Sequence, residues 1–152
     1  MSEISVACFF CEDFRREMDG RCSAIGIYSV LGQMEEFPSE VDRLRLVTYI
    51  SVPQSLDRCT ISVELHRKGV ISEHKLKETL SEEIVRDDNL KDHPYWQIIN
   101  EYELGPLTFE TDGYLEAVVR ADTVGTSCRL HYVEFSDTEA EDLENESQST
   151  LQ

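Results

Sequence analysis

Hydrophobic and polar residues alternate along most of the chain, which is the pattern of half-buried β-strands. The clearest stretch is 58–67, where polar or charged residues alternate with four hydrophobic ones, Cys59, Ile61, Val63 and Leu65. The same period of two predicts further strands at 3–11, 21–30, 43–52, 95–104, 114–121 and 127–135. A short extended piece is expected at 107–109 and a turn at 111–113.

The first two of these strands are expected to form a hairpin. A charged segment follows 3–11, and Asp19-Gly20 supplies the turn before the second strand begins. Gly26 lies within that second strand, where a glycine marks a bulge or a close approach of another chain segment.

One segment departs from the alternation. Between residues 72 and 91 hydrophobic positions are sparse, and Leu76, Leu80 and Ile84 recur every four residues. This spacing suits one stripe of an amphipathic helix with Ser72 as its N-cap, and a charged loop gives much the same pattern. We therefore expect a two-layer antiparallel β-sandwich of about seven strands, with a short helix or loop inserted near 70–92.

Length and composition suit one compact domain. The chain has 152 residues, of which 40% are hydrophobic and 9% aromatic. We assign residues 1–136 to a single sandwich domain and expect 137–152, which lack aromatics and are rich in acids, to be a disordered tail. No apolar run approaches the ~18 residues of a membrane span, and Glu3, Glu12 and Asp13 argue against a signal peptide, so a cytoplasmic location is expected.

The chain is strongly acidic, with a net charge of −17. Six acids and no base lie from Asp137 onward, which leaves −11 for the rest. Such a surface repels phosphate groups, so direct binding to nucleic acid or to an anionic membrane is not expected. The acidity either keeps the protein soluble or belongs to an inhibitor that imitates DNA and occupies a basic surface of a partner.

A family resemblance rests on the first hairpin. Cys11-Glu12-Asp13, followed by Gly20-Arg21-Cys22-Ser23-Ala24-Ile25-Gly26-Ile27-Tyr28, resembles the opening of a family of small uncharacterised bacterial proteins. The later Gly105-Pro106-Leu107-Thr108-Phe109 and Asp112-Gly113-Tyr114 resemble that family's closing strands. The chain departs from the pattern at Arg21-Cys22 and in its insert near 70–92. The resemblance implies an immunoglobulin-like sandwich and a bacterial or phage origin, and it implies no activity.

The chain contains five cysteines, at positions 8, 11, 22, 59 and 128. The odd number and the expected location favour free thiols. Cys8 and Cys11 have the spacing of a metal or redox pair, but residues three apart on a strand point to opposite faces. No second Cys-x-x-Cys or histidine pair supplies further ligands, so we predict structural cysteines and no metal.

No catalytic or cofactor signature stands out. His66 and His131 fall on the predicted solvent faces of strands, and no Gly-x-Ser-x-Gly elbow accompanies them. A general acid needs an apolar pocket, whereas the pairs of adjacent acids in this chain lie in charged surroundings. These pairs are Glu12-Asp13, Glu35-Glu36, Glu82-Glu83 and Asp87-Asp88. The chain also lacks a phosphate loop and an Asp-x-Asp-x-Asp-Gly calcium loop. We therefore expect no cofactor and no enzyme.

Two groups of residues are candidates for contact with a protein partner. The first is Glu12, Asp13, Arg15 and Arg16, which either dock a partner or form a salt-bridge cluster that anchors the hairpin. The second is the loop residue His93 with Tyr95, whereas the adjacent Trp96 is expected in the core. The leading hypothesis is a non-enzymatic cytoplasmic interaction module that binds through sandwich loops or a sheet edge. The alternatives are the acidic inhibitor and a calcium-binding or enzymatic module.

Overall fold

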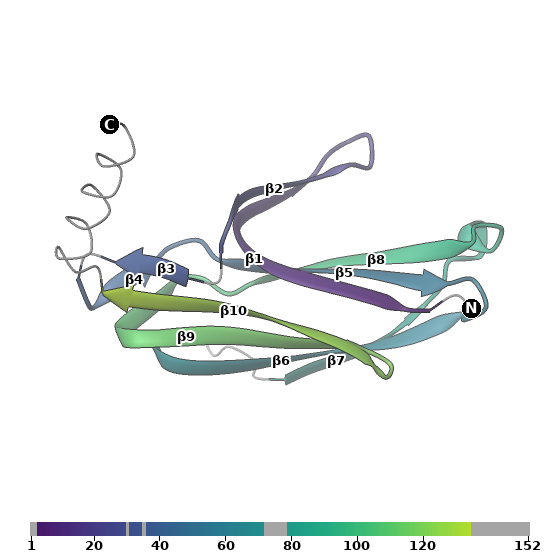
Figure 1. Cartoon of the computed structure of the whole chain (residues 1–152). Coiled ribbons are helices and arrows are strands. Elements are labelled where there is room, and N and C mark those ends of the chain that lie inside the picture. Colours follow the sequence, from purple (N-terminus) through teal and green to yellow (C-terminus); the bar gives the residue numbers. More distant parts are fainter. Residues whose placement is uncertain (1–2, 30, 35, 72–78, 135–152) are drawn as a thin grey trace, which may run out of the picture.

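The chain folds into two β-sheets packed face to face (Figure 1). The computed structural model describes residues 3–29, 31–34, 36–71 and 79–134. Sheet A has four antiparallel strands in the order β2 (Cys22–Ile27), β1 (Ser5–Arg16), β5 (Arg45–Pro53) and β8 (Tyr95–Glu103). The mainly β sandwich predicted from the alternation is thus confirmed.

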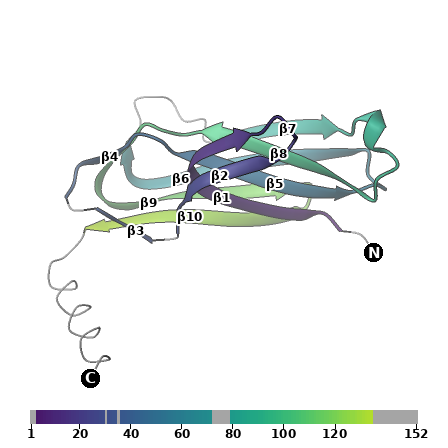
Figure 2. The same cartoon turned by 90° about the horizontal axis from the view of Figure 1, so that it is seen from above.

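Sheet B forms the second layer. Its order is β3 (Leu31–Met34), β10 (Val124–Glu134), β9 (Leu107–Ala121), β6 (Arg58–Ile71) and β7 (Thr79–Val85), and β4 (Ser39–Val41) also pairs with β9. Its pairs are antiparallel, apart from β10 with β3. Seen from above, β7 and β8 run along the same long side of the sandwich (Figure 2).

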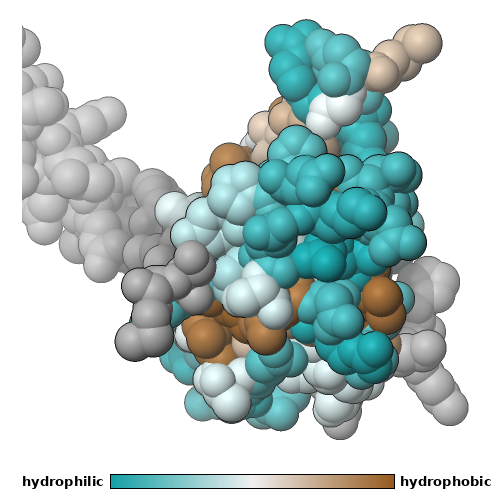
Figure 3. Space-filling model, turned by 90° about the vertical axis from the view of Figure 1, so that its right-hand side faces the viewer, coloured by the Kyte–Doolittle hydropathy of each residue, from teal (hydrophilic) through white to brown (hydrophobic). Residues whose placement is uncertain are grey.

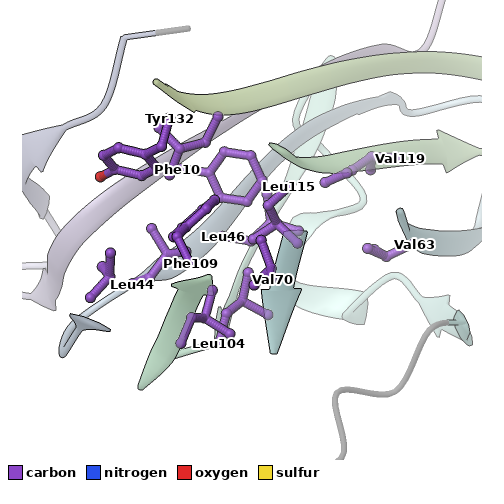
Figure 4. Close-up of a cluster of buried hydrophobic side chains, with 14 residues drawn as sticks. Phe10, Leu44, Leu46, Val63, Val70, Leu104, Phe109, Leu115, Val119 and Tyr132 are labelled. Carbon is purple, nitrogen blue, oxygen red and sulfur yellow. The ribbon is translucent and has the colours of Figure 1, made fainter. Parts of the chain in front are cut away.

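The main core fills the space between the sheets. Phe10 of sheet A meets Phe109 and Tyr132 of sheet B, and the ring centroids of these last two lie 4.5 Å apart (Figure 4). Leu46 and Leu115 complete the centre, and both are fully buried. The inward positions of 43–52, 58–67 and 95–104 are those that the alternation predicts, including the buried Trp96.

The predicted helix is wrong wherever the structure describes its segment. Thr79–Val85 is strand β7, which pairs with β6, and only a 3-10 turn follows at Asp88–Leu90. Leu80 and Ile84 recur every four residues, and four is also a multiple of the strand period, so both point towards the core. Ser72 and Leu76 lie outside the described residues, as does the predicted tail at 137–152.

Two predicted boundaries also differ from the structure. The turn at 111–113 is absent, and β9 runs unbroken from Leu107 to Ala121. The irregularity is a bulge of β9, whose residues 110–113 lie opposite the single residue Gly69 of β6. Gly69 has a φ of +69°, and a Cβ on Gly113 would lie only 2.0 Å from the Lys68 carbonyl oxygen. The strand predicted at 21–30 ends at Ile27 in sheet A, and the chain then enters sheet B as β3.

Candidate functional site

Among the residues that the structure describes, no strand pairs with the outer edge of β8. In sheet A the Gln54 amide donates to the Pro94 carbonyl and the Leu104 amide to the Leu44 carbonyl, so even-numbered residues of this strand bond to β5. The backbone groups of the odd-numbered residues therefore point away from the sheet: Tyr95, Gln97, Ile99, Glu101 and Glu103. We call this row the β8 edge, and it is a template for one more strand.

A hairpin arm reaches this edge from the other side of sheet A. Beyond Cys11, β1 pairs with β2, and together they rise as an arm that passes over β8 (Figures 1 and 2). Gly26 allows the bend, because its φ is +63° and a Cβ there would lie 3.0 Å from the Glu12 Cβ. Figure 3 shows the arm projecting from the body with a mostly hydrophilic surface.

A small hydrophobic cluster holds the arm to the sheet. Cys11, Phe14 and Val47 are buried together on the outer face of sheet A, and Ala24 and Ile99 pack around them. At the end of the arm, the Arg16 guanidinium donates a hydrogen bond to the Ile99 carbonyl oxygen. Because that oxygen belongs to the β8 edge, Arg16 occupies one of the outward acceptors that an added strand would use.

The other charged residues predicted near the hairpin form an ion-pair network. Arg15 Nε lies 2.9 Å from Asp13, and Arg45 lies 3.8 Å from Asp13 and 3.2 Å from Glu101. The hydrogen bond from Arg15 is the main cause that lowers the pKa of the Asp13 carboxyl, so it stays ionised. This geometry is that of the anchoring salt-bridge cluster, and Glu12 lies exposed beside Gly26.

The second predicted group lies elsewhere. His93 and Tyr95 are exposed at the beginning of β8, where the His93 amide donates to the Leu90 carbonyl and Tyr95 lies opposite Pro53. Tyr95 precedes Ile99 by four residues, which places it roughly 13 Å from the Arg16 contact along an extended strand. The structure therefore does not gather the six predicted residues into one site, although Arg16 and Tyr95 both lie along the β8 edge.

A cavity opens beside the β8 edge, between the two sheets. It has a volume of about 230 Å³ and is lined by Ile61, Leu80, Ser81, Glu82 and Tyr102. Its floor is apolar, and Glu82 and the Tyr102 hydroxyl give it a polar side. We call it the β7–β8 cavity.

Unpaired polar groups lie next to this cavity. Thr48 and Asn100 face each other across β5 and β8, and the next pair on the same inward face is Leu46 and Tyr102. Thr48 Oγ1 and Asn100 Nδ2 are the buried side-chain atoms that lack a hydrogen-bond partner among the described residues. Burial raises the pKa of the Tyr102 hydroxyl and side-chain contacts with Asn100 and Thr48 oppose that rise, so this group stays protonated.

The cysteines do not converge on a shared ion. Cys8 packs against the main core, whereas Cys11 lies in the cluster on the outer face of sheet A, so the two thiols are on opposite faces of β1. Across the described ranges, no group of three or more His, Cys, Asp or Glu residues could hold a metal ion. All five cysteines are free thiols.

Comparisons with known proteins assign the chain to no family. No protein-family model, no curated protein and no solved structure matches it. The bacterial resemblance of the first hairpin therefore stays a prediction. Within the described part of the chain, no helix has the length and apolar character needed to cross a membrane.

Sequence reasoning missed the most distinctive parts of this site. The open edge follows from strand order, which alternation does not reveal, and the cavity joins β6, β7 and β8. One signal was present in the sequence: Pro94 and Pro106 flank a strand with no charge before Glu101. A strand bounded in this way at both ends is compatible with an edge position.

Proposed function

We propose that this protein is a non-enzymatic interaction module that binds an extended, basic segment of a partner protein along the β8 edge. The observation that carries the proposal is the outward backbone of five alternating residues from Tyr95 to Glu103, beside a cavity between the sheets. Addition of a strand to such an edge is a recurring way to bind a peptide.

Backbone groups supply the first part of the interaction. An added strand makes hydrogen bonds to the outward N–H and C=O groups of Tyr95, Gln97 and Glu101, which lie at every second residue. The strand is regular along its pairing with β5 and carries no bulge, so the outward groups are evenly presented. Ile99 is the exception, because Arg16 holds its carbonyl.

Side chains supply the selectivity. Every second side chain of an added strand points towards the space between the sheets, where the β7–β8 cavity lies. A lysine suits this cavity, since its methylene stem contacts Ile61 and Leu80 while its ammonium group reaches Glu82 and Tyr102. Glu82 forms no ion pair within the part of the chain that the structure describes.

Charge favours the same occupant. The chain carries −17, and Glu82, Glu101 and Glu103 border the edge and cavity. A basic segment is therefore attracted, and an acidic one repelled, over a distance comparable to the Debye length. This occupant unites the sheet-edge hypothesis with the alternative of an acidic protein that covers a basic partner surface.

A synthetic peptide provides the test. The probe is a peptide of alternating lysine and valine as long as β8, and fluorescence anisotropy measures its affinity. Gln97→Pro deletes one outward N–H without removing a bond to β5, so we expect about tenfold weaker binding. Val85→Pro is the matched control, because Val85 occupies the corresponding outward position on β7 and its replacement should leave the affinity unchanged.

Neither substitution alters the charge of the protein, so the pair separates strand addition from simple attraction between opposite charges. Amide exchange should slow at Tyr95, Gln97 and Glu101 when the peptide is bound. Equal affinity of both proline variants, or exchange that slows elsewhere and not on β8, would contradict the proposal. A glutamate–valine peptide should not bind.

A further inference from the structure

Two cysteines that are distant in the sequence meet at one corner of the sandwich. Cys8 on β1 and Cys128 on β10 both pack against the main core, and both are half-buried. Their side chains are close enough for a hydrogen bond between the two thiols. The two strands belong to different sheets, so these sulfur atoms lie across the junction between the layers.

The backbone at this corner is not closed by hydrogen bonds between the sheets. β2 pairs with β1 only from Cys11 onward, and β3 pairs with β10 only from His131 onward. Ser5–Phe10 and 124–130 therefore each have a ladder partner on one side, and β1 and β10 contact one another. The side chains of Cys8 and Cys128 thus bridge two strand segments that have no ladder between them.

The pair differs chemically from the other cysteines. The hydrogen bond from Cys128 lowers the pKa of Cys8, and the same bond, together with burial, raises the pKa of Cys128. Burial raises the pKa of Cys11, and it raises that of Cys59 to about 11. Cys22 is exposed on the hairpin and has no second thiol in contact among the described residues. Cys8 therefore has a stabilised thiolate form and an adjacent thiol to resolve it.

We propose that Cys8 and Cys128 form a reversible disulfide that joins the two sheets, with hydrogen peroxide as the oxidant. The Cys8 thiolate attacks one peroxide oxygen, the O–O bond breaks, and Cys8 sulfenic acid forms as hydroxide leaves. The Cys128 sulfur then attacks the Cys8 sulfur, the S–O bond breaks and the S–S bond forms. The protons of the two thiols leave in two water molecules, so one peroxide is reduced for each disulfide formed.

The disulfide closes a loop that contains most of the domain and fixes the corner where β1 and β10 cross. Closing a long loop restricts the unfolded chain, so the oxidised protein should unfold at a higher temperature than the reduced one. A dithiol reductant restores the two thiols by exchange.

Peptide mapping tests the site on the full chain. The protein is treated with limiting hydrogen peroxide, the remaining thiols are alkylated, and the linked peptides are identified by mass spectrometry. We expect a link between the peptides that contain Cys8 and Cys128, loss of the link with dithiothreitol, and an upward shift of the unfolding temperature on oxidation. Cys22 should remain alkylated.

Cleavage after arginine leaves Cys8 and Cys11 on one peptide, so the Cys11→Ser variant makes the assignment. That variant should keep the link, whereas Cys8→Ser should lose it and leave Cys128 free for alkylation. Links to Cys11 or Cys22, or recovery of both Cys8 and Cys128 as alkylated thiols while Cys22 is oxidised, would overturn the proposal. The wild-type map decides the matter even where Cys8→Ser does not fold.

Discussion

The two faces of sheet A carry hydrophobic residues along the same strand, yet they have different roles. On β5, Leu46 and Ile50 face inward and are fully buried against sheet B. On the outer face of β5, Val47 is buried under the hairpin arm, whereas Tyr49 is 37% exposed. The inner face is buried along the whole strand, whereas the outer face is buried only at Val47, under the arm, and at the strand's last residue, Pro53.

This difference separates the part of sheet A that stabilises the fold from the part that shapes the candidate site. Contact with sheet B makes the inner face a closed core, where packing density is high. The outer cluster contains Cys11, Phe14 and Val47, and its main consequence is to hold Arg16 over the Ile99 carbonyl. Substitutions on the two faces should therefore change different properties.

The largest effect is expected on the inner face. Leu46→Ala removes a fully buried side chain beside Phe10 and Phe109, and should lower the free energy of unfolding by about 2–5 kcal/mol. Urea unfolding followed by fluorescence measures this change. Tyr49→Ala on the same strand is the matched outer-face control and should cost less. A similar loss in both variants would show that the arm-free outer face is as important to stability as the core.

A second effect of the inner face appears at high pH. Cys59 packs in the core between the sheets, and burial raises its pKa from the ordinary value of 9.0 to about 11. The folded state therefore holds the thiol proton more tightly than the unfolded state. The contribution of Cys59 to the free energy of unfolding is complete below pH 9 and is lost as the pH rises towards 11. The loss is about 3 kcal/mol at most. The free energies of unfolding of wild type and of Cys59→Val should diverge between pH 8 and pH 11. The variant should lose less stability than wild type as the pH rises, because it has no thiol at this position to ionise.

The inner face is the part of the fold that the sequence predicts well. Alternation in 43–52, 58–67 and 95–104 identifies the buried residues because a strand packed on one side needs a period of two. The helix prediction was wrong for its described part, 79–91, because Leu80 and Ile84 fit both the helical and the strand period, and only the pairing of β7 with β6 distinguishes the two. The turn predicted at 111–113 was wrong because the bulge that replaces it depends on Gly69 of another strand.

The candidate site was much harder to predict. Arg16 was identified as a residue of interest, but its contact with Ile99 depends on the bend at Gly26 and on the order of strands in sheet A. The contact between Cys8 and Cys128 joins two residues that lie near opposite ends of the domain's sequence. Periodicity correctly separates Cys8 from Cys11, and it cannot identify the thiol on another sheet.

A smaller loss of stability is expected from the outer cluster. Phe14→Ala should lower the free energy of unfolding by about 2 kcal/mol, less than for a phenylalanine in a closed core, because the arm adjusts over the gap. The variant should also release the arm, so that proteolysis after Arg15 or Arg16 becomes faster while the main core stays folded. Unchanged proteolysis would mean that the ion pairs of Asp13, rather than this cluster, hold the arm in place.

The smallest effect on stability and the most direct effect on the β8 edge should come from Arg16→Gln. It removes a single exposed charged donor, so the free energy of unfolding should change by about 1 kcal/mol or less. The Ile99 carbonyl then becomes available to an added strand, and the lysine–valine peptide should bind several-fold more tightly, a gain that also reflects the loss of one positive charge.

Arg15→Gln separates those two contributions, because it removes the same charge from the neighbouring residue but breaks the contact with Asp13 instead. Anisotropy titrations of both variants in parallel give the comparison. A larger gain for Arg16→Gln than for Arg15→Gln shows that the hairpin arm masks part of the edge. Equal gains would assign the whole effect to charge and leave the outer face without a role in binding.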